Sequence, residues 1–82
     1  MSCYTYILYS ESLDKYYVGF TCVSLEERLK LHNGNHKGFT GSCNDWKVLY
    51  FEVYDSKELA YKREREIKKW KSRKRIEQLI GS

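Results

Sequence analysis

Two stretches of aromatic and β-branched residues near the N-terminus predict two strands joined by a short polar turn. The stretches YTYILYS (Tyr4–Ser10) and KYYVGFT (Lys15–Thr21) are rich in aromatic and β-branched residues, which favour strands. Four residues, 11–14, separate the two stretches, and three of these four are polar. Two strands joined this closely are expected to form an antiparallel hairpin.

Strand alternation also predicts which tyrosines share a face. Successive side chains of a strand point to opposite faces, so Tyr6 and Leu8 should lie together on one face of the first strand. In the second strand, Tyr17 and Gly19 should share a face, while Tyr16 points the other way into the core. The missing side chain of Gly19 leaves room for a substrate backbone or a closely packed helix.

A helical period of apolar residues begins after Ser24, which is the expected N-cap. Glu27 lies three residues later, as in a capping box, and an Asn-Gly pair ends the segment. Arg28 and His32 fall one helical turn apart beside the apolar stripe of this short helix. Each also has an ordinary structural explanation, as a surface charge paired with a glutamate or as a cation near a helix C-terminus.

The next apolar stretch, WKVLYFEVY (Trp46–Tyr54), is again aromatic and β-branched and predicts a third strand. It follows a loop that contains three of the five glycines of the chain. By simple alternation the side chains of this strand fall into two sets. Val48 and Tyr50 should share one face, with Leu49, Phe51 and Val53 on the other.

Two helices are predicted after the third strand. The first begins at Ser56 and places Ala60, Glu64 and Ile67 on one face. A carboxylate in an apolar stripe is costly to bury unless a cation neutralises it, so Glu64 needs a metal ion or a partner such as Lys68, four residues later. The second helix is shorter, and its apolar residues are spaced to pack against the core: Ile76, Leu79 and Ile80.

The order of these elements is strand, strand, helix, strand, helix, helix, and this order defines the fold class. We expect a single α+β domain, residues 1–82, with a small three-stranded, mostly antiparallel sheet flanked by helices. Eighty-two residues with 41% hydrophobic composition are sufficient for one modest core.

The charge is unevenly distributed along the chain. Residues 1–55 hold five Lys/Arg and seven Asp/Glu, a net charge of −2, whereas residues 56–82 hold ten Lys/Arg and four Asp/Glu, a net charge of +6. A final third this basic favours a polyanionic partner. A solvated helix with i,i+4 ion pairs is the alternative explanation of the same composition.

The cysteines and the lack of targeting signals indicate the cellular compartment. Cys3, Cys22 and Cys43 are widely spaced and form no CxxC pair, so we expect reduced, half-buried thiols and no zinc site. No apolar run reaches the length of a membrane span, and the N-terminus lacks the pattern of a signal peptide. We therefore expect a cytoplasmic protein without a membrane partner.

The polar residues singled out above suit chemistry on phosphodiesters if they converge on one face of the molecule. An arginine binds phosphate through two hydrogen bonds and neutralises charge in the transition state. A carboxylate can hold Mg²⁺, which prefers oxygen ligands and retains several waters. A tyrosine or histidine can take the proton of an attacking water.

These residues form an ordered set that resembles the GIY-YIG endonuclease superfamily. The two name-giving motifs correspond to YTY (Tyr4–Tyr6) and YVG (Tyr17–Gly19), whose functional tyrosines are eleven residues apart. The arginine that the family carries four residues before a histidine or tyrosine corresponds to Arg28, with His32, and the helical glutamate of the family corresponds to Glu64. The resemblance spans nearly the whole chain and points to the short stand-alone bacterial members, which are related to the nuclease domain of the repair excinuclease.

The resemblance implies a divalent-metal-dependent endonuclease with assigned catalytic roles. Glu64 would hold one Mg²⁺ or Mn²⁺ ion, and Arg28 would neutralise the phosphate. Tyr6, with His32, would take the proton of the attacking water while Tyr17 orients water or phosphate. The sequence leaves open which of the two tyrosines has which role, and Gly19 would be a structural residue of the site.

The sequence departs from the family pattern at several positions. Tyr4 stands where glycine is common and Thr5 where isoleucine is common, and a strand tolerates both substitutions. We identify no counterpart after Glu64 of the asparagine that several members carry. The glycine-rich loop offers three residues for a supporting role: His36, Lys37 and Thr40.

The implied substrate is nucleic acid, with DNA in a repair or recombination role as the favoured choice. One alternative is a nucleic-acid-binding module with little catalysis, in which Trp70 stacks on a base or packs beneath a basic surface. Trp70 itself is expected in the core, because it follows Ile67 at helical spacing. Another is a component recruited by a larger repair partner, and the oligomeric state is left open. Phosphate contacts are expected from six basic residues: Lys37, Arg63, Lys68, Lys71, Arg73 and Lys74.

Overall fold

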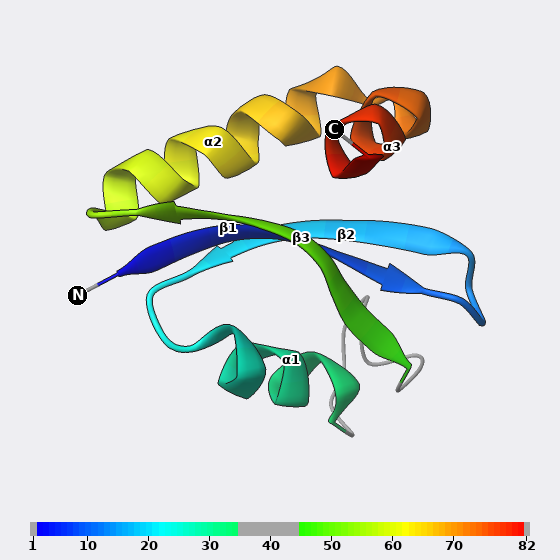
Figure 1. The fold of residues 1–82 in the computed structure, drawn as a ribbon, viewed down its shortest axis with the longest axis horizontal. Coiled ribbons are helices and arrows are strands. Elements are labelled where there is room, and N and C mark those ends of the chain that lie inside the picture. The colour runs from blue at the N-terminus through cyan, green and yellow to red at the C-terminus, as the bar shows by residue number, and fades with distance from the viewer. Residues whose placement is uncertain (1, 35–44, 82) are drawn as a thin grey trace.

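A three-stranded sheet lies at the centre of the molecule, with one helix on one face and two helices on the other (Figure 1). This computed structural model describes residues 2–34 and 45–81. The predicted α+β class and the element order β-β-α-β-α-α are both confirmed. The elements are β1 (Cys3–Ser10), β2 (Lys15–Thr21), α1 (Leu25–Asn33), β3 (Trp46–Tyr54), α2 (Lys57–Trp70) and α3 (Arg73–Gly81).

β1 is the central strand of the sheet, and both of its neighbours run antiparallel to it in the order β2-β1-β3. β1 and β2 form the predicted hairpin, with the pairing running from Tyr4 opposite Thr21 to Ser10 opposite Lys15. As expected for a strand with neighbours on both sides, most of β1 is buried. Within the described residues, no helix has both the length and the apolar composition that crossing a bilayer requires.

The two faces of the sheet carry separate hydrophobic clusters. On the face covered by α1, Tyr6, Leu8 and Trp46 are buried, and Leu25 and Leu29 of α1 pack against them. On the face covered by α2 and α3, Ile7 and Ile67 are buried together. These contacts confirm the alternation predicted for β1. They also confirm the packing of three residues of α3: Ile76, Leu79 and Ile80.

A β-bulge in β3 makes the predicted face assignment of this strand wrong. Ile7 pairs with Tyr50 and Leu8 pairs with Val48, so Leu49 is an extra residue in the ladder. An extra residue shifts the alternation of the side chains on either side of it. Val48 therefore packs on the α1 face and Tyr50 packs on the opposite face, whereas simple alternation predicted one shared face.

Serine side chains cap the three helices, in agreement with the sequence prediction for α1 and α2. In each case the serine Oγ accepts a hydrogen bond from a backbone N–H of the first turn, which has no partner within the helix. The capping bonds run from Glu27 to Ser24 in α1, from Leu59 to Ser56 in α2 and from Arg75 to Ser72 before α3.

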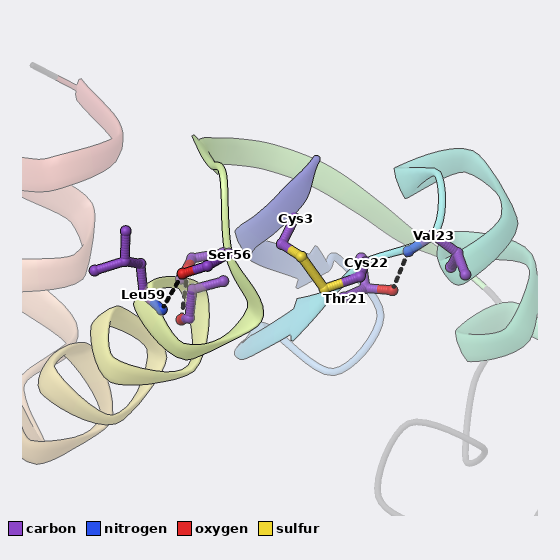
Figure 2. Close-up of a disulfide and its surroundings, with 8 residues drawn as sticks. Cys3, Thr21, Cys22, Val23, Ser56 and Leu59 are labelled. Atoms are coloured by element: carbon purple, nitrogen blue, oxygen red, sulfur yellow. Dashed lines mark hydrogen bonds between the residues drawn. A yellow bond between two sulfur atoms is a disulfide. The ribbon is translucent and has the colours of Figure 1, made fainter. Parts of the chain in front are cut away.

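Cys3 and Cys22 form a disulfide, so the expectation of reduced thiols is wrong for these two cysteines (Figure 2). The hairpin register explains the pairing. Tyr4 lies opposite Thr21, so the next residue outward on each strand also faces its counterpart, and the Cα atoms of the two cysteines are 4.0 Å apart. The bond ties the start of β1 to the segment that leads into α1. Cys43 lies outside the described residues.

Candidate active site

Four of the predicted site residues meet on the α1 face of the sheet. Tyr6 comes from β1, Tyr17 from β2, and Arg28 and His32 from α1. The hydroxyl of Tyr6 is their meeting point, because Tyr6 Oη lies 3.0 Å from His32 Nε2 and accepts a hydrogen bond from Arg28 Nε at 3.4 Å. The rings of Tyr17 and His32 pack together, with their centroids 4.8 Å apart.

Helix α1 directs Arg28 and His32 toward the sheet because Leu25 and Leu29, on the same side of the helix, pack on this cluster. The end of the helix is fastened to β3 by Asn33, one residue after His32. Asn33 Oδ1 accepts a hydrogen bond from Trp46 N at 2.8 Å, and Asn33 Nδ2 donates to Trp46 O at 2.9 Å. The sequence pattern identified Asn33 only as part of a helix stop, so this anchoring contact was missed.

Burial controls the protonation of Tyr6. The residue is 1% exposed, and this burial raises the pKa of its hydroxyl above the ordinary value of tyrosine, although Arg28 acts in the opposite direction. The hydroxyl therefore keeps its proton at neutral pH. Arg28 donates to the hydroxyl oxygen of Tyr6, so the hydroxyl can donate its own proton to His32 Nε2. This requires the His32 tautomer in which Nε2 carries no proton.

Gly19 lies directly opposite Tyr6 in the hairpin and makes room for its side chain. A Cβ atom at position 19 would lie 2.6 Å from Tyr6 Oη and 3.1 Å from Tyr17 Cε2. Real Cβ atoms do not approach other atoms as closely as the first of these distances. The absence of a side chain here thus allows the two tyrosines to lie on one face beside each other.

Glu64 reaches this region from α2, which packs on the opposite face of the sheet from α1. Four of the five predicted residues thus meet through direct contacts, whereas Glu64 comes from the other layer and acts on the Tyr6 hydroxyl through its charge. The carboxylate is buried and pairs with Lys68, with 3.3 Å between Glu64 Oε1 and Lys68 Nζ. Lys68 Nζ in turn lies 5.7 Å from the centroid of the Tyr17 ring, a cation–π distance. Lys68 thus connects Glu64 to the tyrosine cluster.

Glu64 is also the residue that could hold a divalent cation. Among residues 2–34 and 45–81, no three His, Cys, Asp or Glu side chains gather into a metal site. A buried carboxylate that already attracts a cation suits a hard ion that keeps most of its waters, as Mg²⁺ does. The donor set therefore fits one Mg²⁺ or Mn²⁺ ion held by a single carboxylate, and does not fit an all-protein cage.

The basic residues expected to contact nucleic acid differ in their surroundings. Arg63 and Arg73 each form ion pairs with two carboxylates. Lys68 forms the ion pair described above, whereas Lys71 and Lys74 are exposed near the junction of α2 and α3. The other expected contact and its neighbours in the glycine-rich loop lie outside the described residues: Lys37, His36 and Thr40.

Trp70 lies at the end of α2 and is partly buried. One side of the residue packs against the cluster around Ile7. Its ring also carries the guanidinium groups of Arg63 and Arg75, whose Cζ atoms are 5.6 and 4.4 Å from the ring centroid. The expected packing of Trp70 against the core is confirmed, and its ring also lies beneath two arginines.

Comparisons with known proteins agree with the fold and with the family resemblance of the sequence. Residues 2–77 match the family model of the GIY-YIG catalytic domain, a range that includes every residue of the cluster. Among solved structures, the solution NMR structure of the UPF0213 protein BH0048 from Bacillus halodurans is similar, with a TM-score of 0.60 and 29% sequence identity. The match covers 99% of this chain and 84% of that chain. A comparison with curated proteins found no match.

Proposed function

The chain belongs to the GIY-YIG catalytic domain family, and on this premise we propose that it is a divalent-metal-dependent endonuclease. Its proposed substrate is nucleic acid, with DNA favoured, and its proposed setting is DNA repair or recombination. The observation that carries the proposal is that a guanidinium and an imidazole both meet the hydroxyl of Tyr6. One hydrogen bond would be enough to satisfy a buried tyrosine, so the second partner supports a role in proton transfer beside a bound anion.

Arg28 is proposed to bind the scissile phosphate. It uses Nε for Tyr6, and its two terminal nitrogen atoms would bind phosphate oxygens in the paired geometry that a guanidinium prefers. This places positive charge where negative charge develops in the transition state. The same contact to Tyr6 keeps the guanidinium next to the residue that handles the proton.

Tyr6 and His32 are proposed to move the proton of the attacking water. Because burial keeps Tyr6 protonated at neutral pH, its oxygen takes a proton from water only as its own proton passes to His32 Nε2. Tyr17, which packs on His32, would orient the water or the phosphate. In the alternative form of this mechanism, Tyr17 takes part in proton transfer and Tyr6 orients the water or the phosphate.

Glu64 is proposed to hold the Mg²⁺ or Mn²⁺ ion, which when bound would stabilise charge on the phosphate and on the leaving 3′ oxygen. Exposed lysines near the α2–α3 junction, Lys71 and Lys74, would contact the nucleic-acid backbone. Arg63 and Arg73 would do so only by giving up contacts with carboxylates.

A cleavage assay with Glu64→Gln tests the proposal. Wild type would be incubated with labelled plasmid, single-stranded DNA, branched DNA and structured RNA, with Mg²⁺ or Mn²⁺ and then with EDTA. We expect cleavage of at least one substrate, inhibition by EDTA, and a Glu64→Gln protein that still binds nucleic acid but cuts at least about 100-fold more slowly. Glu66→Gln is the matched control, because Glu66 lies on the exposed side of the same helix. Cleavage by Glu64→Gln at the wild-type rate, or cleavage in EDTA, would overturn the proposal.

A nucleic-acid-binding module with little catalysis is the second candidate, and the burial of Tyr6 favours it. A side chain that is 1% exposed and has two partners on its hydroxyl does not meet bulk water in this conformation. In that case wild type and Glu64→Gln bind nucleic acid equally well and neither protein cuts any of the four substrates.

A further inference from the structure

Lys68 is the counter-cation of the buried Glu64 carboxylate. Only 9% of the Glu64 side chain is exposed, and Lys68 Nζ lies 3.3 Å from Glu64 Oε1. A glutamate four residues before a lysine is the favourable order for such a pair on a helix. A buried carboxylate without a cation is strongly disfavoured. Lys68 therefore supplies the positive charge that Glu64 needs.

A second contact turns the Lys68 side chain toward the tyrosine cluster. Its ammonium lies 5.7 Å from the Tyr17 ring centroid, so the charge sits between Glu64 and a residue that contacts His32. The neighbouring Lys69 differs, since it lines a shallow exposed groove on α2 together with other charged side chains. The two lysines are thus adjacent in sequence but have different electrostatic surroundings.

We propose that Lys68 competes with a divalent metal ion for the carboxylate of Glu64 and couples metal binding to phosphate binding. This inference rests on the proposed function only in taking Glu64 as the metal ligand. A divalent ion and an ammonium on one carboxylate repel each other, so metal affinity is low while Lys68 occupies Glu64. A phosphodiester offers the ammonium another anionic partner. The side chain is 47% exposed and has a flexible four-carbon stem, so it is free to change partner.

The coupling is reciprocal, as linkage requires. If phosphate draws Lys68 away from Glu64 and so strengthens metal binding, bound metal strengthens phosphate binding by the same factor. The consequence is a site that assembles its metal together with its substrate. Lys68 is in this sense a positioning residue, because it acts through Glu64 and the phosphate.

Mn²⁺ binding to the full chain, followed by the electron paramagnetic resonance signal of free Mn²⁺, tests the first half of the proposal. We expect Lys68→Gln to bind Mn²⁺ about tenfold more tightly than wild type. Lys69→Gln should stay within about twofold, because its charge lies on the solvent side of α2 and is screened. The double variant with both Glu64→Gln and Lys68→Gln should not show this tighter Mn²⁺ binding, because it lacks the carboxylate. Thermal unfolding of each variant checks that it is folded.

Dimethyl phosphate, a phosphodiester that resists hydrolysis, tests the second half. It should tighten Mn²⁺ binding to wild type and leave Lys68→Gln unchanged. The proposal is overturned if Lys68→Gln binds Mn²⁺ no more tightly than Lys69→Gln, if the gain survives loss of Glu64, or if dimethyl phosphate affects both proteins equally. These results do not depend on cleavage. If the protein binds Mn²⁺ as expected but cuts nothing, the nuclease proposal is overturned and the Lys68 proposal stands. If it cuts nucleic acid but Lys68→Gln does not change Mn²⁺ binding, the Lys68 proposal is overturned and the nuclease proposal stands.

Discussion

At the scale of single residues, the site depends on how closely β1 and β2 approach at the pair formed by Tyr6 and Gly19. The tyrosine ring is enclosed by the hydrophobic cluster on the α1 face, and its hydroxyl is held by Arg28 and His32. There is therefore little freedom for the ring to move away from an atom added at position 19. Any such atom acts directly on the hydrogen bonds of the proposed catalytic hydroxyl.

Gly19→Ala should therefore destabilise the protein and impair the site. The new Cβ would lie 2.6 Å from Tyr6 Oη, and we expect a loss of about 2 kcal/mol in the free energy of unfolding, as for other overpacked cores. Urea unfolding measures this loss. Gly81→Ala is the control, because a Cβ there meets nothing within 4 Å, and it should stay within about 0.5 kcal/mol of wild type. A Gly19→Ala protein as stable as wild type would contradict the packing described here.

Sequence reasoning identified the residues of the α1 face better than it identified their contacts. Arg28 and His32 were found because helical spacing is local information, and alternation placed Tyr6 on the same face as its cluster partners. Their hydrogen bonds were not predicted, since these depend on how α1 crosses the sheet. The Cys3–Cys22 disulfide was missed for a similar reason, because a separation of 19 residues becomes a contact only through the hairpin register.

At the scale of elements, the edge strand β3 is held to α2 by Glu52. Arg63 Nε donates to Glu52 Oε1 at 3.0 Å, and the hydroxyls of Tyr50 and Tyr54 donate to the same carboxylate. Burial acts to raise the pKa of Glu52, but the hydrogen bonds from the two tyrosines and Arg63 outweigh it and hold the pKa below the usual value. The ionised carboxylate therefore stabilises the contact between strand and helix.

Glu52→Gln should lower the free energy of unfolding by about 2 kcal/mol at neutral pH, the range of hydrogen bonds to charged groups. Because the folded pKa of Glu52 lies below the unfolded one, its stabilisation is complete above the unfolded pKa and is lost as pH falls through the folded pKa. The difference between wild type and Glu52→Gln should thus shrink when urea unfolding is repeated near about pH 3.

Glu66→Gln provides the matched control for this prediction. Glu66 also pairs with Arg63, but its side chain is 54% exposed. Exposed ion pairs contribute little, so its loss should cost less than about 1 kcal/mol. An equal cost for the two variants, or a Glu52→Gln effect that does not change with pH, would contradict the role given to Glu52.

The limits of sequence reasoning at this scale are clearest in β3. The existence of β3 follows from its composition. The bulge at Leu49 depends on pairing with β1 and cannot be seen in the order of apolar and polar residues. Faces on either side of a bulge cannot be assigned by counting residues. Glu52 was likewise not singled out, because its partners come from α2 and from its own strand only once the two pack together.

At the scale of the whole molecule, the site draws on both sides of the sheet. β1, β2 and α1 supply the tyrosines, arginine and histidine on one face, whereas α2 supplies Glu64 from the other. The fold was predictable because each element carries its own signals of caps, period and turns. The position of α2, and so the direction from which Glu64 reaches the site, was not predictable. Periodicity shows which face of a helix is buried, but it does not show which face of the sheet that helix covers.

The nuclease mechanism is tested most directly by single-turnover cleavage with Tyr6→Phe beside Tyr16→Phe. The control removes a hydroxyl from the same hairpin, but one that donates to Glu77 of α3. We predict that Tyr6→Phe cuts at least about 100-fold more slowly than wild type, as for loss of a proton-transfer group, and that Tyr16→Phe cuts at close to the wild-type rate. A Tyr6→Phe protein that cuts as fast as wild type, or a wild type that cuts nothing, would contradict the mechanism.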